Sequence, residues 1–189
     1  IRHHLNETLR EFKAAEKLIL GICNGFQILM KSGILLPDAA EAGPAATLTW
    51  NDSGRFDDRW IQMAVSKNNS VFLRNIERLY LPIAHAEGKF VVRDAAAFES
   101  LAEQNQLPLR YCLDDGVISD DVLSFPANPN GSVGNVAGVC DQTGRVLGLM
   151  PHPERYIEPT QHPQWTRGVA RDPGDGLAIF QNAVAYFAD

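Results

Sequence analysis

A cysteine flanked by two glycines is the part of this sequence best suited to chemistry. Cys23 lies in Gly-Ile-Cys-Asn-Gly, with an apolar run before it at 17–20 and another after it at 26–30. This order predicts a buried strand, a sharp turn that exposes the thiol, and a helix. The glycines leave room for a strained turn, and the helix start favours the thiolate. A small structural cysteine is the alternative.

The second reactive feature is a histidine between two prolines, in Pro-His-Pro-Glu-Arg at residues 151–155. The prolines oppose a helix, so we expect extended backbone in which His152 and Glu154 project to one side. A carboxylate beside an imidazole holds its tautomer and stabilises the imidazolium formed in catalysis. With Cys23 these residues would form a Cys-His-Glu triad, whereas alone they would indicate a solvated surface turn.

Further polar residues could belong to the same site. His85 and Glu87 have the same spacing as His152 and Glu154 and are an alternative catalytic pair. We favour a structural or subunit-contact role for them. Gln27 lies one helical turn after Cys23, near a pocket around the thiol or on the helix surface. Arg155 could pair with a carboxylate or contact a partner, and both roles stay open.

A polar turn is predicted at the sequence Asn-Pro-Asn-Gly-Ser. Its members Asn128, Asn130 and Ser132 could face the pocket. Asx and Ser turns also commonly bond their own backbone, which is the alternative role of these three residues.

Four segments together resemble the glutamine amidotransferase subunit of phosphoribosylformylglycinamidine synthase. They are Gly-Ile-Cys-Asn-Gly-Phe-Gln (21–27), Pro-Ile-Ala-His-Ala-Glu-Gly (82–88), Asn-Pro-Asn-Gly-Ser (128–132) and Met-Pro-His-Pro-Glu-Arg (150–155). The resemblance implies an α/β fold of the class I glutamine amidotransferase type. Such a fold is a three-layer, flavodoxin-like sheet with helices on both faces.

The resemblance also implies roles for the site residues. Cys23 would attack the side-chain amide of glutamine, and Glu154 would orient His152. His152 would protonate the departing ammonia and then activate water. The backbone N–H of Asn24 would be an oxyanion donor, and Gln27 would contact bound glutamine.

The function implied is that of a glutaminase subunit in de novo purine biosynthesis. Its partners would be glutamine, a separate ATP-dependent synthetase that converts formylglycinamide ribonucleotide to formylglycinamidine ribonucleotide, and a small third subunit in addition. ATP and magnesium are expected on the synthetase, because this sequence has no glycine-rich loop that could cradle phosphates. We expect no cofactor and no metal in this chain.

Family members carry an earlier segment with the first strands of the sheet and a Pro-Gly-Gly loop that supplies a second oxyanion donor. This sequence begins at Ile1, inside an expected helix, and contains no such loop. We therefore expect the first strands to be missing. The alternatives are the C-terminal domain of a single-chain synthase, a non-catalytic assembly subunit, and an unrelated thiol hydrolase.

The length and composition allow a single domain over residues 1–189, which the resemblance implies is a glutamine amidotransferase domain that lacks its N-terminal segment. Hydrophobic residues make up 45% and charged residues 21% of the chain, an ordinary globular balance. The net charge of −6 provides no basic surface for nucleic acid. No apolar run reaches the roughly 20 residues that a membrane span needs. The three cysteines, an odd number without compact spacing, fit a reducing compartment, and we expect a cytoplasmic protein.

The remaining cysteines and histidines show no pattern typical of a disulfide framework or a metal site. Cys112 and Cys140 lie in strand-like runs and are expected in the core. The adjacent His3 and His4 would face different directions on a helix, so we expect them on the surface.

The rest of the pattern predicts alternating helices and strands. We expect helices at 2–16, 24–32, 94–104 and 176–187, strands at 17–22, 60–66, 78–83, 108–112, 133–140 and 145–150, and irregular segments at 38–47, 119–132 and 156–175. Asp94 should cap the third helix, and Gly144 should permit a hairpin between the last two strands. Two apolar stripes should face the core: Leu5, Leu9, Phe12 and Ala15, and Leu177, Phe180, Val184 and Phe187.

Overall fold

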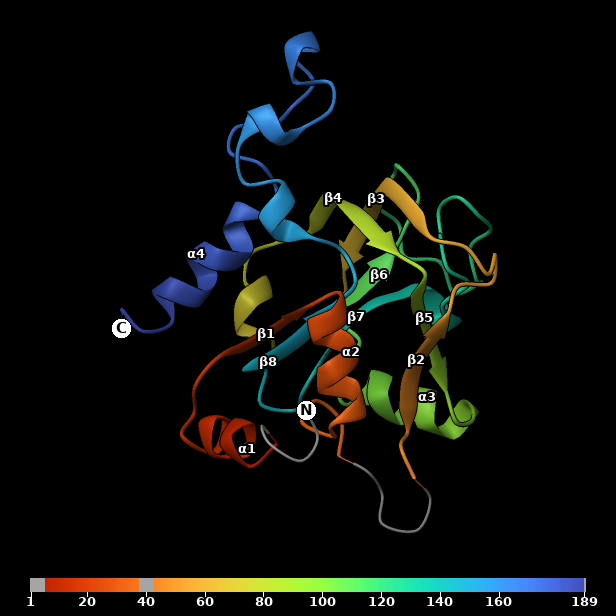
Figure 1. Cartoon of the computed structure of the whole chain (residues 1–189), viewed down its shortest axis with the longest axis vertical. Helices are drawn as coiled ribbons and strands as arrows, with labels where there is room; N and C mark the ends of the chain where they lie inside the picture. Colours follow the sequence, from red (N-terminus) through yellow and green to blue (C-terminus); the bar gives the residue numbers. More distant parts are fainter. Residues whose placement is uncertain (1–5, 38–42, 189) are drawn as a thin grey trace.

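The computed structural model describes residues 6–37 and 43–188, which form strands surrounded by helices (Figure 1). The helices are α1 (Asn6–Ala14), α2 (Asn24–Lys31), α3 (Ala95–Glu103) and α4 (Leu177–Ala185). Short 3₁₀ helices are η1 (Val71–Leu73), η2 (Val133–Asn135), η3 (Pro153–Arg155), η4 (Pro159–Gln161) and η5 (Trp165–Arg167). The strands are β1 (Ile19–Ile22), β2 (Ala46–Trp50), β3 (Asp57–Val65), β4 (Arg78–His85), β5 (Glu87–Val92), β6 (Leu109–Tyr111), β7 (Val136–Cys140) and β8 (Val146–Leu149).

The larger sheet brings the two reactive segments to one edge. Its strands follow the order β1-β8-β7-β6-β3-β4, and β1 runs parallel to β8 while the other described pairs are antiparallel. The carboxyl ends of neighbouring parallel strands lie together, so the residues after β1 and after β8 are brought close. The backbone N–H of Cys23 accordingly donates to the carbonyl oxygen of Leu149 at 2.8 Å.

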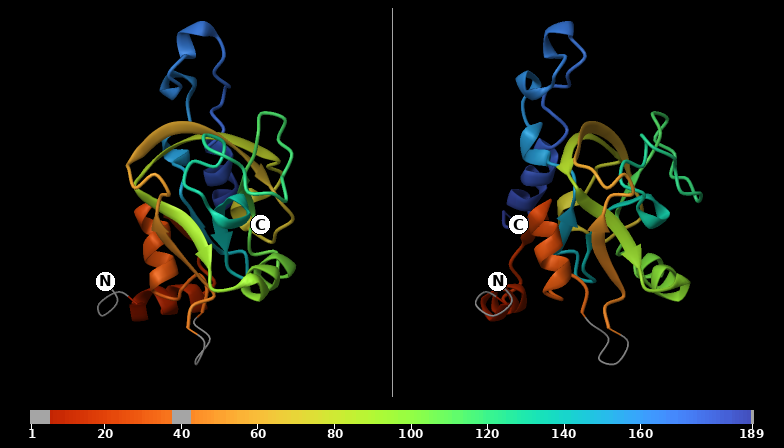
Figure 2. Two further views of the ribbon diagram at one scale, coloured as in Figure 1. Left: turned by 90° about the vertical axis from the view of Figure 1, so that its right-hand side faces the viewer. Right: turned by 45° about the vertical axis from the view of Figure 1, so that its right-hand side comes forward.

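Helices cover both faces of this sheet. On one face α2 packs on β1 and β8, and its Phe26 enters a core cluster that includes residues of β2, β5 and α3. On the other face Ile179 of α4 enters a second cluster with β3, β4 and η1. Successive side chains of a strand point to opposite faces of the sheet. In β8, Val146 therefore belongs to the first cluster and Leu147 to the second. The predicted three-layer α/β architecture is confirmed, with a mixed, curled sheet (Figure 2).

The sequence pattern does not predict the two-stranded ribbon of β2 and β5. These strands pair antiparallel, with Leu48 opposite Phe90, and both side chains are buried in the α2 cluster. β2 begins inside the stretch expected as a loop, and β5 follows β4 after a single residue, Ala86. A short ribbon with one buried side gives too few alternating residues for a clear strand signal.

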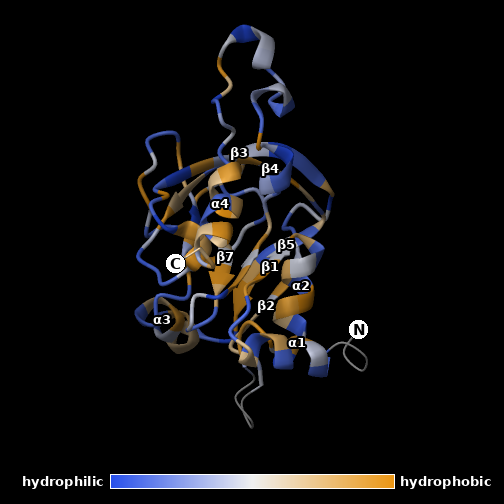
Figure 3. Ribbon diagram, turned by 90° about the vertical axis from the view of Figure 1, so that its left-hand side faces the viewer, coloured by the Kyte–Doolittle hydropathy of each residue, from blue (hydrophilic) through white to orange (hydrophobic). Residues whose placement is uncertain are grey.

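The outer helices bury fewer apolar residues than the sequence pattern predicts. Phe12 of α1 is 47% exposed, and Val184 and Phe187 in and after α4 are 73% and 60% exposed. In α4 the buried residue is Ile179, which the predicted stripe left out. All residues of α4 except Gln181 and Asn182 are apolar, so no single stripe defines its buried face. The side of α4 seen in Figure 3 is mostly orange. Outside the described residues lie His3, His4 and Leu5.

The predicted helix cap and the predicted hairpin turn are both confirmed. Asp94 Oδ1 accepts the backbone N–H of Ala97 at 2.8 Å at the start of α3, and Gly144 has a φ of 72° in the β7–β8 hairpin.

The segment between η3 and α4 (blue) contains η4 and η5 and projects away from the sheet (Figures 1 and 2). Within residues 6–37 and 43–188, no helix has the length and apolar character to cross a bilayer.

Candidate active site

Cys23 occupies the sharp turn between β1 and α2. Its φ of 52° and ψ of −106° are unusual for a residue with a side chain, and such strain concentrates at functional positions. A Cβ at Gly21 would lie 2.5 Å from the Leu29 side chain and 2.9 Å from the Gly25 backbone. A Cβ at Gly25 would meet nothing within 4 Å. The predicted steric need for glycine therefore holds at Gly21 and is wrong at Gly25.

The thiol lines a pocket of about 490 Å³ where β1 and β8 end. The pocket combines the start of α2, the end of β4, the start of β5 and the residues after β8. Cys23 and His152 both line it, and both are largely buried, with 8% and 7% exposed. Its walls are Ile22, Cys23, Asn24, Gln27, Phe56, Ala84, His85, Ala86, Glu87, His152 and Arg155.

His152 Nδ1 and Glu154 Oε1 lie 2.6 Å apart, but the backbone differs from the expected extended segment. Residues 153–155 form the 3₁₀ turn η3, in which Pro153 takes the first position, where its missing N–H has no cost. The backbone N–H of His152 donates to the carbonyl oxygen of Pro82 in β4 at 2.8 Å. The carboxylate thus engages Nδ1, while the buried Nε2 has no partner among the described residues.

Burial raises the pKa of the Cys23 thiol above its ordinary value. The backbone N–H of Asn24 and the guanidinium of Arg155 oppose this rise, and the carboxylate of Glu154 adds to it. The expected preference for thiolate is therefore wrong here, because burial outweighs the helix start. The sulfur lies 3.8 Å from the carbonyl oxygen of Ala84, to which a thiol can donate. The proton must consequently leave during the reaction.

We expect Arg155→Gln to slow alkylation of Cys23 by iodoacetamide about two- to threefold near pH 8, an effect limited because exposed charges interact weakly. Arg155 lowers the pKa of the thiol, so its removal raises that pKa and reduces the reactive thiolate. The side chain is 49% exposed, which allows solvent to screen it. When the alkylation rate is plotted against pH over the alkaline range, the curve of Arg155→Gln should lie at higher pH than that of the unaltered protein.

Arg155→Lys is the matched control, because it keeps the positive charge and should react nearly as fast as the unaltered protein. Faster alkylation of Arg155→Gln than of the unaltered chain would contradict the electrostatic role of this side chain.

Asn24 and Gln27 line the pocket from the first turn of α2. Gln27 Nε2 donates to the carbonyl oxygen of Glu87 at 2.5 Å, which ties the helix to β5 and makes Gln27 part of the pocket wall. The backbone N–H of Asn24 lowers the pKa of the Cys23 thiol. Its role as an oxyanion donor stays a prediction.

His85 and Glu87 line the same pocket without forming a pair. His85 Nδ1 lies 3.1 Å from Oδ1 of Asn51, whereas Glu87 offers its backbone carbonyl to Gln27. His85 is 4% exposed, and burial lowers its pKa to about 4. Of the two expected roles, structural or subunit contact, the burial of His85 and its contact with Asn51 support the structural one. Asn51 lies 34 positions from His85, and no local pattern in the sequence links the two.

The Asn-Pro-Asn-Gly-Ser turn is not among the residues that line the pocket. Asn130 Nδ2 donates to the carbonyl oxygen of Gly88 at 2.8 Å, and Ser132 Oγ accepts the backbone N–H of Phe90 at 2.9 Å. Asn128 Oδ1 accepts the backbone N–H of Ser132 at 3.1 Å. The expectation that these side chains face the pocket is wrong, because all three are buried. Asn128 bonds the backbone of its own turn, as the alternative role predicts, whereas Asn130 and Ser132 anchor β5, which carries part of the pocket wall.

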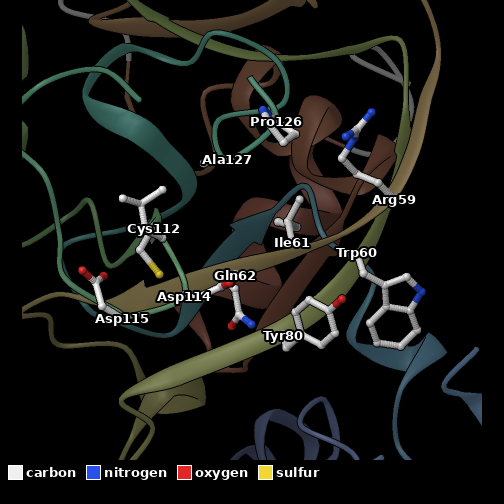
Figure 4. A pocket seen from close by; sticks show the side chains of 11 residues that line it. Arg59, Trp60, Ile61, Gln62, Tyr80, Cys112, Asp114, Asp115, Pro126 and Ala127 are labelled. Atoms are coloured by element: carbon white, nitrogen blue, oxygen red, sulfur yellow. The ribbon is translucent and has the colours of Figure 1, made fainter. Parts of the chain in front are cut away.

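A second pocket of about 560 Å³ lies beside β3 and β4 (Figure 4). The rings of Trp60 and Tyr80 stand side by side at one end, with centroids 5.2 Å apart, and Cys112 and Asp115 lie at the other. The described residues that line it include no histidine, so its cysteine has no imidazole as a base. In the described part of the chain, no three His, Cys, Asp or Glu residues are placed to hold a metal ion. The Cys23 pocket is therefore the candidate active site.

Comparison with known proteins agrees with this chemistry. Residues 1–187 match the CobB/CobQ-like glutamine amidotransferase domain family. Phosphoribosylformylglycinamidine synthase subunit PurQ of Dehalococcoides mccartyi is 43% identical over 187 residues, which cover 98% of this chain and 70% of the relative. The same subunit of Methanococcus maripaludis strain S2 is 37% identical, with 99% and 72% covered.

A solved structure shows the same relationship in three dimensions. A chain in the structure of PurLQS from Thermotoga maritima superimposes with a TM-score of 0.70 at 30% identity. The match covers 97% of this chain and 68% of that chain. The chain therefore belongs to the CobB/CobQ-like glutamine amidotransferase family and, within it, to the PurQ subunits of phosphoribosylformylglycinamidine synthase.

Proposed function

We propose that this chain hydrolyses glutamine and supplies the ammonia to an ATP-dependent synthetase that makes formylglycinamidine ribonucleotide. One observation carries the proposal. Cys23 stands at a strained turn and shares a pocket with His152, whose ring lies 2.6 Å from the carboxylate of Glu154. Membership in the PurQ group supports the same reaction.

The first half of the reaction forms a thioester. The carboxamide carbon of glutamine would lie beside Sγ of Cys23. As the carbon–sulfur bond forms, the thiol proton passes to Nε2 of His152. The oxyanion develops near the backbone N–H of Asn24. The carbon–nitrogen bond then breaks while His152 returns its proton to the nitrogen, and ammonia leaves.

The second half hydrolyses the thioester. Water attacks the same carbonyl carbon, and His152 takes its proton. The carbon–sulfur bond breaks, the sulfur regains a proton from the imidazolium, and glutamate leaves. The carboxylate of Glu154 stabilises the imidazolium in both halves and keeps Nε2 directed at the reacting atoms.

The acceptor of the ammonia belongs to another subunit in this proposal. We place ATP and magnesium on that synthetase, and we include a small third subunit in the complex. The similar chain in PurLQS of Thermotoga maritima supports an assembly with partner subunits.

We expect the chain alone to release equal amounts of glutamate and ammonia from L-glutamine, which coupled assays for both products measure. When the synthetase and its substrates are added, the rate of glutamate release should rise, and glutamate is the product to assay because the ammonia is consumed. An unchanged rate would argue against coupling to a synthetase. Absence of hydrolysis even with the partner, together with Cys23-dependent cleavage of simple esters, would favour an unrelated thiol hydrolase.

A further inference from the structure

A buried histidine outside the proposed triad lines the same pocket as the reacting sulfur. His85 ends β4 and is 4% exposed. The carbonyl oxygen of Ala84, the preceding residue, is 3.8 Å from the sulfur of Cys23, and both lie in the pocket wall with His85. The ring of His85 packs directly against Gly88, where a Cβ would come between 2.4 and 2.9 Å from three ring atoms.

Asn51 fixes the tautomer of this ring. Its side-chain nitrogen donates to two carbonyl oxygens, those of Arg55 at 3.0 Å and of His85 at 2.9 Å. Because two carbonyls require an NH₂ group, the remaining polar atom of Asn51 is its acceptor oxygen. That oxygen lies 3.1 Å from Nδ1 of His85, so Nδ1 carries the proton. In the neutral ring Nε2 therefore holds a lone pair.

This lone pair is unused within the described part of the chain. Nε2 of His85 is buried and has no hydrogen-bond partner there. Burial also lowers the pKa of His85 to about 4, although the charge of Asp57 opposes the shift, so the ring is neutral near pH 7. A buried acceptor without a partner is costly, and His85 lines the pocket, so a ligand that supplies a donor would satisfy this atom.

We propose that Nε2 of His85 accepts a hydrogen bond from the carboxamide nitrogen of the substrate and then from the ammonia formed from it. This inference rests on the proposed hydrolysis of glutamine. A carboxamide has one acceptor oxygen, which the N–H of Asn24 can bind, and two N–H donors that need an acceptor. In the neutral ring Nε2 has no proton to give, so it accepts such a bond without converting ammonia to ammonium, which is not nucleophilic.

Two substrates that form the same thioester test this role. L-Glutamine carries N–H groups on its leaving group, and the γ-methyl ester of L-glutamate carries none. In the chain assayed with its synthetase, His85→Asn should lower kcat/KM for glutamine about tenfold, the worth of roughly one hydrogen bond. The kcat/KM for the ester should stay within about twofold of the value for the unaltered chain. Asparagine keeps a donor near the position of Nδ1 and loses only the acceptor at Nε2.

His85→Gln is the matched control, because its amide oxygen lies near the position of Nε2 and should restore most of the glutamine activity. Gly88→Ala is an independent variant that leaves His85 chemically intact and displaces its ring. It should show the same selective loss, with folding checked by thermal unfolding of each variant.

Equal losses for both substrates, or no loss for either, would overturn the role of His85 while leaving glutamine hydrolysis in place. An unaltered complex that hydrolyses the ester and not glutamine would refute the proposed function, and this inference with it.

Discussion

Replacing Cys23 by alanine should reduce glutamine hydrolysis to background, since removal of a catalytic nucleophile costs on the order of 10⁶-fold where the loss is fully resolved. No other atom in the proposed mechanism forms the covalent bond to the substrate. Alanine keeps the Cβ and tolerates the φ of 52° about as well as cysteine does, so the fold should be retained. Ammonia release and the midpoint of thermal unfolding measure the two effects.

Cys112→Ala is the matched control for this experiment. Cys112 is also a buried free thiol, but it lines the second pocket. Its removal should leave glutamine hydrolysis unchanged. Acid quenching during turnover should trap a glutamyl adduct on the unaltered chain and none on Cys23→Ala. Glutamine turnover by Cys23→Ala at more than a few per cent of the unaltered rate would refute the assignment.

The sequence predicts local features of the site better than non-local ones. The turn at Cys23 depends on neighbours such as Gly21, whose missing side chain lets the turn approach α2. The cap at Asp94 and the hairpin at Gly144 are local in the same sense. The environment of His85 depends on Asn51, the residue that follows β2, and no spacing rule connects them.

Burial is the property that local patterns predict least well. The helix start behind Cys23 favours the thiolate, yet enclosure by β4 and the segment after β8 raises the pKa of the thiol. The polar Asn-Pro-Asn-Gly-Ser turn is buried beneath β5 because its side chains satisfy backbone groups there. In both cases the outcome depends on which strands pair, and β2 and β5 gave little signal of their own.

The raised pKa of Cys23 makes the role of His152 testable. A thiol that keeps its proton needs a base during the attack, and Nε2 of His152 is the unpartnered ring nitrogen of the proposed triad. His152→Asn should therefore lower kcat by between about 100- and 10,000-fold, the usual contribution of general acid–base catalysis. Asparagine keeps an N–H near Nδ1 for Glu154, so the loss reports the missing Nε2. Steady-state rates of ammonia release measure it.

The pattern across substrates separates His152 from His85. His152→Asn should impair glutamine and the γ-methyl ester alike, because the sulfur must lose its proton in both reactions and water must later be activated. His85→Asn should impair glutamine alone and about tenfold, as one hydrogen bond predicts. Glu154→Gln should cost less than His152→Asn, because Glu154 is 43% exposed and water can partly replace its contact. A larger loss from His85→Asn than from His152→Asn would move the catalytic base to His85.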